Sequence, residues 1–129
     1  MHSTNYRNAL ITVSTDCPVS IATAPIKLGT IADMQFRLLS EAPYALTSDE
    51  LFLAIENKRK GPVTFEAFFS TPKACLRTSP LVKKYGYGLH HNAEGRVALV
   101  AMESEEYISL LTNTAIEKCP GMRNARHRM

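Results

Sequence analysis

Four helices can be located in this sequence because a hydroxyl residue precedes each helical stretch and proline or glycine follows it. The best defined of them follows Thr47, which has the capping-box pattern with Glu50, and it ends at Gly61-Pro62. Apolar residues recur at helical spacing within each stretch. The other three helices each run from a hydroxyl residue to a proline: Thr30 to Pro43, Thr64 to Pro72, and Ser104 to Pro120.

The rest of the chain contains four candidate strands. Residues 9–14 are rich in β-branched residues, and residues 75–79 can run extended up to Pro80. Residues 84–91 and 96–102 are predicted to pair as a hairpin around the turn at 92–95. In the helix after Thr64, the apolar stripe consists of Phe65, Phe68 and Phe69, which we expect in the core.

Strands and helices do not alternate one by one in this order, so a doubly wound parallel sheet is not expected. We predict an α+β fold: a single domain over residues 1–121 with about four helices packed on a small, mainly antiparallel sheet. Hydrophobic residues make up 45% and charged residues 21% of the 129 residues, which is typical of a folded domain and excludes wholesale disorder.

The net charge of +3 comes from the C-terminal end of the chain. Residues 117–129 contain Lys118, Arg123, Arg126 and Arg128 against Glu117, and the remainder is balanced. A nucleic-acid-binding domain usually spreads its basic residues over a face. We therefore interpret residues 122–129 as a solvated basic tail, and nucleic-acid contact through this tail ranks last among the functional alternatives.

The sequence lacks the features of a membrane, metal or nucleotide-binding protein. No apolar run approaches the roughly 18 residues of a membrane span, and no secretion signal is present. Cys17, Cys75 and Cys119 are widely separated, so we predict no metal site and a reducing compartment. No phosphate-binding loop or dinucleotide motif occurs, so no cofactor is assigned. The expected protein is soluble and cytoplasmic, with no membrane partner.

The segment from residue 75 to residue 91 is the most informative for function. If residues 75–79 are extended, Cys75, Arg77 and Ser79 share one face. In the following strand, Lys84, Gly86, Gly88 and His90 would share a face opposite Tyr85, Tyr87, Leu89 and His91. Two glycines on one face indicate a bulge, a closely packed helix, or a ligand lying on the backbone.

A ligand groove at this face would suit an acidic or phosphorylated compound. Arg77 and Lys84 can bind carboxylate or phosphate, and His90 can exchange a proton near neutral pH. Cys75 lies between Lys73 and Arg77, which favours a reactive thiolate. No catalytic role and no reaction are assigned. The candidate ligand-binding residues are Cys75, Arg77, Ser79, Lys84, Gly86, Gly88 and His90.

Each of these residues also has a structural interpretation. The glycines can allow close packing of a helix, Cys75 can be a small core residue, and Arg77 can pair with an acid such as Glu103. In the second functional hypothesis, the glycine face packs against a second copy of the chain. The protein would then be a homodimeric interaction module without catalytic activity.

Several motifs resemble those of a family of small, uncharacterised bacterial and fungal proteins, classed as a domain of unknown function. The resemblance covers residues 1 to about 126. It implies that the chain is a complete protein and that residues 75–90 are the segment to examine; it implies no activity. Tyr87 stands where tryptophan is common, and the connection after Cys17-Pro18 is shorter. The motifs include Met1-His2-Ser3-Thr4-Asn5-Tyr6, Asp16-Cys17-Pro18, Cys75-Leu76-Arg77-x-Ser79-Pro80-Leu81 and Lys84-Tyr85-Gly86-Tyr87-Gly88-x-His90.

Overall fold

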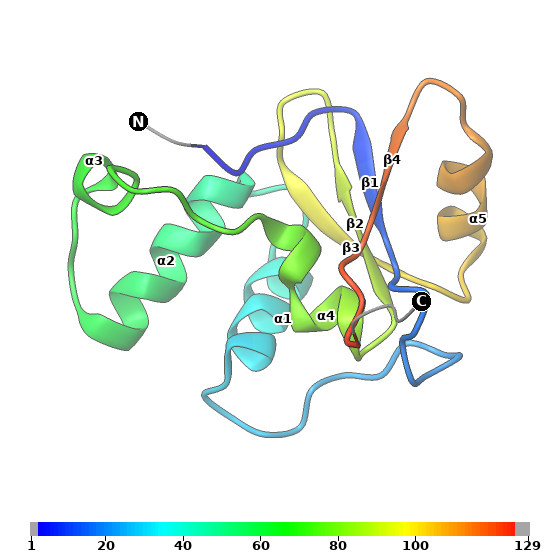
Figure 1. The fold of residues 1–129 in the computed structure, drawn as a ribbon, viewed down its shortest axis with the longest axis horizontal. Helices are drawn as coiled ribbons and strands as arrows, with labels where there is room; N and C mark the ends of the chain where they lie inside the picture. The colour runs from blue at the N-terminus through cyan, green and yellow to red at the C-terminus, as the bar shows by residue number, and fades with distance from the viewer. Residues whose placement is uncertain (1–2, 126–129) are drawn as a thin grey trace.

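The computed structural model describes residues 3–125 and contains a four-stranded sheet with the order β3-β2-β1-β4 (Figure 1). The pairs β1–β2 and β2–β3 are antiparallel, whereas β1 and β4 are parallel. This arrangement confirms the predicted α+β domain with a mainly antiparallel sheet. The strands are β1 (Ala9–Thr12), β2 (Tyr87–His91), β3 (Val97–Ala101) and β4 (Glu117–Pro120).

Helices cover both faces of this sheet. In Figure 1, α1, α2 and α4 lie on one side of the strands and α5 lies on the other. The short helix α3 follows α2, and a single 3-10 turn, η1, precedes α4. The bounds are α1 (Ile31–Glu41), α2 (Ser48–Lys60), α3 (Phe65–Phe68), η1 (Leu76–Thr78), α4 (Pro80–Lys83) and α5 (Glu105–Thr112).

The four predicted helix caps are confirmed. Thr30, Thr47, Thr64 and Ser104 each accept a hydrogen bond from the backbone N–H three residues later. Thr47 and Glu50 complete the capping box in both directions, so the first turn of α2 has its donors satisfied. These local contacts explain why the helices begin where the sequence indicates.

The alternation of side chains along the strands divides the core in two. Ile11, Leu89 and Val97 face the helices α1, α2 and α4 in the larger part. Leu10 and Val100 point the other way and pack with Tyr107 of α5 in the smaller part. β1 and β3 therefore carry apolar side chains on both faces, as expected of strands that are covered on both sides.

The N-terminal segment is fastened to the start of α2 by the buried carboxylate of Asp49, which is 4% exposed. Its Oδ1 accepts hydrogen bonds from the backbone N–H and the hydroxyl of Thr4, both at 2.7 Å. Its Oδ2 accepts the Ser3 hydroxyl at 2.8 Å, while the Asp49 N–H donates to Asn5 Oδ1 at 2.9 Å. This clamp fixes the chain just before Tyr6.

The predicted strand at residues 75–79 is wrong, because this segment forms η1 and leads directly into α4. The Ser79 hydroxyl accepts the Leu81 N–H at 3.1 Å and caps α4, with Pro80 at its first position. Proline suits this position because it has no N–H that would need a partner there. Cys75, Arg77 and Ser79 therefore do not alternate as residues of one strand.

The last predicted helix is also too long. It ends at Thr112, and the Asn113 side chain then accepts the Ala115 N–H at 2.9 Å in a turn. Residues 117–120 instead form β4, whose Glu117 N–H donates to Asn8 O at 2.9 Å. The sequence Glu117-Lys118-Cys119-Pro120 does not alternate between apolar and polar residues, so it gives no strand pattern.

Only part of the phenylalanine stripe lies in the core. Phe69 is fully buried, whereas Phe65 at the start of α3 is 36% exposed. Because α3 has only four residues, Phe65–Phe68, the three rings do not all lie on one buried helix face. Phe68 packs against Phe69, and the Lys73 ammonium lies 4.4 Å from the centre of the Phe68 ring.

Candidate functional site

The seven predicted site residues do not converge on one cleft. Gly88 and His90 face α5, whereas Ser79 is buried on the opposite face, where its hydroxyl donates to Gln35 Oε1 at 2.5 Å. Lys84 is exposed after α4. Of the seven, only Arg77 lines the surface hollow described below.

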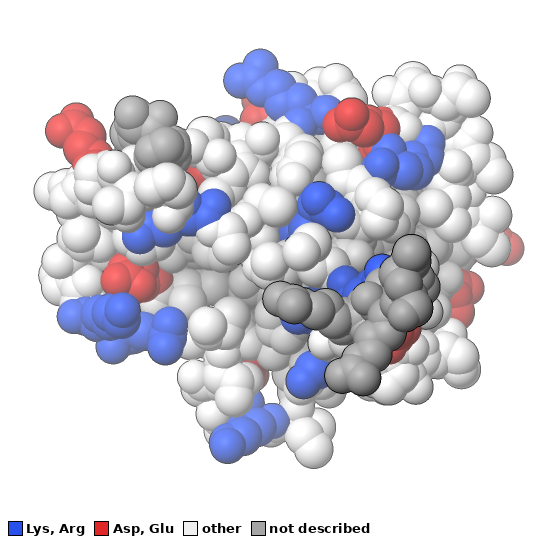
Figure 2. All heavy atoms as spheres, viewed as in Figure 1, with Lys and Arg blue, Asp and Glu red and all other residues white. Residues whose placement is uncertain are grey.

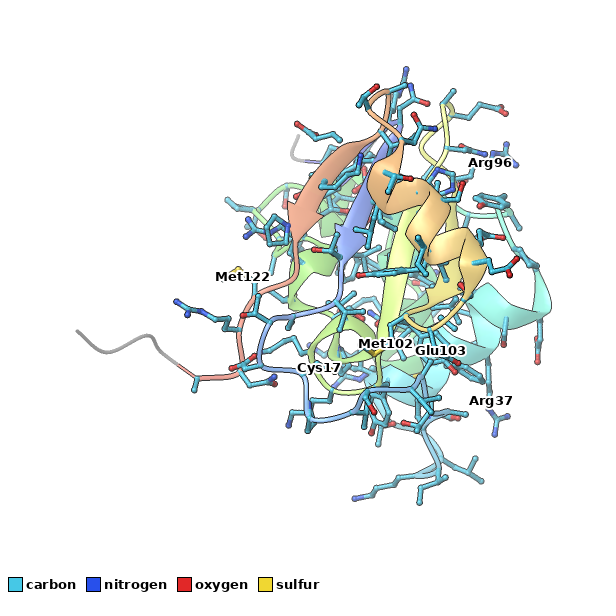
Figure 3. All side chains as sticks on the ribbon, turned by 90° about the vertical axis from the view of Figure 1, so that its right-hand side faces the viewer. Cys17, Arg37, Arg96, Met102, Glu103 and Met122 are labelled. Carbon is cyan, nitrogen blue, oxygen red and sulfur yellow. The ribbon has the colours of Figure 1, made fainter. Side chains whose placement is uncertain are left out.

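The glycine face is covered by the chain itself. A Cβ atom at Gly88 would lie 2.6 Å from Tyr107 Cε2, so this glycine allows α5 to approach the sheet. Gly86 has a φ of 80°, and a Cβ there would lie 2.9 Å from Met102 Sδ. Figure 3 shows Met102 and Glu103 beside the connection between β1 and α1, which carries Cys17. A carboxylate oxygen of Glu103 accepts a hydrogen bond from the Ala22 N–H of this connection at 2.9 Å. Among the predicted interpretations of the glycines, close helix packing fits the geometry at Gly88, whereas Gly86 is covered by Met102 and by the connection that follows β1.

Gly88→Ala is expected to lower the free energy of unfolding by about 1–3 kcal/mol, because the new methyl group collides with the Tyr107 ring. Urea denaturation measures the change. A double-mutant cycle with Tyr107→Ala is the control, since Gly88→Ala should cost less when the ring is absent. An equal cost in both backgrounds would contradict the assigned contact.

His90 is held by an aromatic partner. Its Nδ1 lies 2.8 Å from the Tyr44 hydroxyl, and the two rings meet edge to face. Burial lowers the pKa of His90, and the nearby Glu106 carboxylate partly opposes this effect. Tyr44 has a φ of 59°, which is an uncommon backbone conformation for a residue other than glycine.

Two of the three cysteines, Cys75 and Cys119, lie within electrostatic reach of each other near the β4 edge of the sheet. Cys119 is paired with Ile11 of β1, and its side chain packs against the larger part of the core, which faces α1, α2 and α4. Cys75, immediately before η1, accepts a hydrogen bond at Sγ from the Tyr6 hydroxyl at 3.2 Å. We call Tyr6, Cys75 and Cys119 the thiol cluster.

Electrostatic interactions connect the thiol cluster with Arg77. Burial, the hydrogen bond to Cys75 and the charges of Cys75 and Cys119 raise the pKa of Tyr6 to about 12, and Arg77 partly opposes this effect. Burial and the Glu117 carboxylate raise the pKa of Cys119, which Arg77 again opposes. The guanidinium of Arg77 therefore lies within electrostatic reach of both Tyr6 and Cys119.

Arg77 also ties η1 to the chain that follows β4. Its Nε donates to Pro120 O at 2.6 Å, and its carbonyl oxygen accepts the Met122 N–H at 2.8 Å. Among the described residues, the Pro120 contact is the only hydrogen bond of this guanidinium. No described residue accepts a hydrogen bond from the outer N–H groups of Arg77.

Beside Arg77 lies an open hollow of about 710 Å³, which we call the Arg77 hollow. Its described lining includes two arginines and no acidic residue. The nearby Asp16 carboxylate is occupied by the backbone N–H groups of Asn124 and Ala125, which lower its pKa. The described lining residues are Thr15, Arg77, Pro120, Gly121, Met122, Arg123, Asn124 and Ala125.

The described part of the predicted tail packs back on the domain. The Asn124 side chain donates to Lys83 O at 2.7 Å as well as to Asp16. Arg126 and Arg128 lie outside the described residues. On the face shown in Figure 2, the described Lys and Arg side chains lie in several separate places rather than in one continuous surface.

Sequence reasoning selected Arg77 as a candidate but not the residues that surround it in the structure. Tyr6, Cys119 and residues 120–125 come from the two ends of the chain, and no local pattern links them to residue 77. A signal was present in Gly121-Met122 directly after Pro120, which could have suggested an irregular, ligand-accessible backbone. The cysteine spacing gave no indication of proximity, since Cys75 and Cys119 meet only through the sheet.

The fold and site define a small α+β domain with helices on both sheet faces and an arginine-lined hollow at one edge. The chain belongs to the family of unknown function DUF6157, whose model matches residues 1–127. No curated protein and no solved structure matches it. Within residues 3–125, no helix is both long and apolar enough to cross a membrane, and no group of three or more potential metal ligands occurs.

Proposed function

We propose that this protein binds a small carboxylate- or phosphate-containing compound in the Arg77 hollow. The observation that carries this proposal is the charge of the hollow: both charged residues in its described lining are arginines. A volume of about 710 Å³ also falls in the range of small-molecule sites. The ligand class is the one expected from the sequence, whereas its location shifts from the glycine face to the β4 edge.

The conformation of Arg77 supports recognition of a planar or tetrahedral anion. Its Nε is fixed to the Pro120 carbonyl oxygen, so less side-chain freedom is lost when a ligand binds. A guanidinium offers parallel N–H groups that match two oxygens of a carboxylate or phosphate. The second basic residue, Arg123, follows Met122, whose N–H is bonded to Arg77 O.

Arg77→Gln is expected to weaken the binding of inorganic phosphate at least tenfold, because a charge-assisted pair of hydrogen bonds is lost. Isothermal titration calorimetry measures this at low ionic strength. Arg77→Lys should give an intermediate loss, since it keeps the charge but not the fork. The matched control is Lys84→Gln, which removes an exposed charge outside the hollow. Equal weakening by both glutamine variants, or no phosphate binding to the wild type, would remove this proposal.

A further inference from the structure

We propose that Cys75 and Cys119 form a redox dithiol, in which a hydroperoxide oxidises Cys75 and Cys119 then closes a reversible disulfide. This modification site goes beyond the proposed anion binding and does not depend on it. The observation behind it is the assembly of two reduced thiols and a phenol donor at the β4 edge.

Hydrogen bonds join the parts of the chain that carry the two thiols. Cys119 lies on β4, directly before Pro120, whose carbonyl oxygen accepts Arg77 Nε at 2.6 Å. Cys75 lies two residues before Arg77, whose own carbonyl oxygen accepts the Met122 N–H at 2.8 Å. These two hydrogen bonds join η1 to the last residue of β4 and to the chain directly after it. The thiols influence each other electrostatically, and both influence Tyr6.

The surroundings assign different roles to the two sulfurs. The Tyr6 hydroxyl donates a hydrogen bond to Cys75 Sγ at 3.2 Å, and a donor in this place stabilises negative charge that develops on the sulfur as it reacts. Burial and the Glu117 carboxylate, whose oxygen lies 3.7 Å from Cys119 Sγ, raise the pKa of Cys119. Cys75 is therefore the sulfur that reacts first with the oxidant, and Cys119 is the resolving thiol.

The reaction balances with one molecule of hydrogen peroxide. The Cys75 sulfur attacks one peroxide oxygen, the O–O bond breaks, and the other oxygen leaves as water with the thiol proton. Cys75 is then a sulfenic acid. The Cys119 sulfur attacks the Cys75 sulfur, forms the S–S bond and releases a second water. The two thiols lose two electrons, and the peroxide gains them.

Cys17 provides an internal control. It is half-buried like the other two cysteines, but it lies within electrostatic reach of Tyr107, on the α5 side of the sheet. Neither Tyr6 nor Arg77 interacts with it in the described part of the chain. If exposure alone determined oxidation, Cys17 would react as fast as Cys75.

The test is peroxide treatment of the reduced full chain, followed by alkylation with N-ethylmaleimide and peptide mapping by mass spectrometry. The expected product is a Cys75–Cys119 linked peptide that dithiothreitol releases, with Cys17 alkylated. Cys119→Ser should leave a sulfenic acid on Cys75 that dimedone captures, and Cys17→Ser should change nothing. Tyr6→Phe keeps the ring but removes the donor, and it should slow oxidation of Cys75 by about 2- to 10-fold.

Two results would overturn the proposal. One is a peroxide-treated wild type in which Cys75 and Cys119 are both alkylated, or are linked only between different molecules. The other is oxidation of Cys17 at the same rate as Cys75, with no effect of Tyr6→Phe. The linked peptide is measured in the wild-type chain, so this result does not depend on the stability of any variant. The oxidation buffer contains no phosphate. The result therefore does not depend on whether the Arg77 hollow binds an anion.

Discussion

Asp49→Ala is expected to lower the free energy of unfolding by about 2–4 kcal/mol. The carboxylate accepts three hydrogen bonds from Ser3 and Thr4, and it is almost completely buried. Alanine leaves the Thr4 N–H and hydroxyl without this acceptor, and it removes a negative charge from the first turn of α2. Urea denaturation at pH 7 measures the difference from the wild type.

The control for this prediction is another acid of the same helix. Glu56→Gln removes a carboxylate from α2 whose 3.9 Å ion pair with Lys60 lies at the surface, so the change should stay below about 0.5 kcal/mol. Asp49→Asn should fall between the two, because one amide oxygen can still accept hydrogen bonds. An Asp49→Ala variant as stable as Glu56→Gln would show that the N-terminal segment is not clamped.

The clamp also matters for the thiol cluster. Tyr6 follows directly on the residues that Asp49 holds, and its hydroxyl reaches Cys75, which is 69 positions later. The stability of the first turn of α2 is thus connected to the position of the phenol. The same substitution should therefore slow the oxidation of Cys75, in the direction expected for Tyr6→Phe.

The elements that sequence reasoning predicted are those determined by nearby residues. Thr47 and Glu50 are three positions apart, and the capping box they form is complete in the structure. The hairpin of β2 and β3 likewise depends on a short turn between its strands. The error at residues 75–79 has a local cause too, since Ser79-Pro80 suits the start of a helix as well as the end of a strand.

The site could not be predicted in the same way because it depends on a parallel pairing of the two ends of the chain. β4 aligns with β1 residue by residue, from Ala9 opposite Glu117 to Thr12 opposite Pro120. Only this pairing brings Cys119 to the side of η1. The spacing of the glycines, in contrast, is visible in the sequence. The sequence does not show what covers Gly88, because the position of Tyr107 depends on how α5 packs on the sheet.

His91 is expected to make the domain less stable as the pH falls from 7 to 4.5. Its ring is fully buried, and neither ring nitrogen has a hydrogen-bond partner among the described residues. Burial, and to a smaller extent the neighbouring His90, lower its pKa from 6.5 to about 4. The unfolded chain takes up a proton near pH 6.5, whereas the folded chain does so only near pH 4, so acid favours unfolding in this window.

The size of the effect follows from the pKa difference, since each unit corresponds to about 1.4 kcal/mol. Between pH 7 and pH 4.5, His91 should account for a loss of about 2–3 kcal/mol in the free energy of unfolding. In His91→Leu this contribution is absent, and the buried nitrogens are removed as well. The variant should therefore be within about 1 kcal/mol of the wild type at pH 7 and clearly more stable at pH 4.5.

His90→Leu separates this effect from a general histidine contribution. His90 is half-buried and bonded to Tyr44, and its pKa is lowered in the same direction, so its substitution should flatten the pH profile less. The acids Asp16 and Asp33 have lowered pKa values, and their contributions are lost mainly below this window. If the free energy of unfolding had the same pH dependence in wild type and His91→Leu, the prediction would be wrong. The His91 ring would then take up its proton at the same pH in the folded and the unfolded chain.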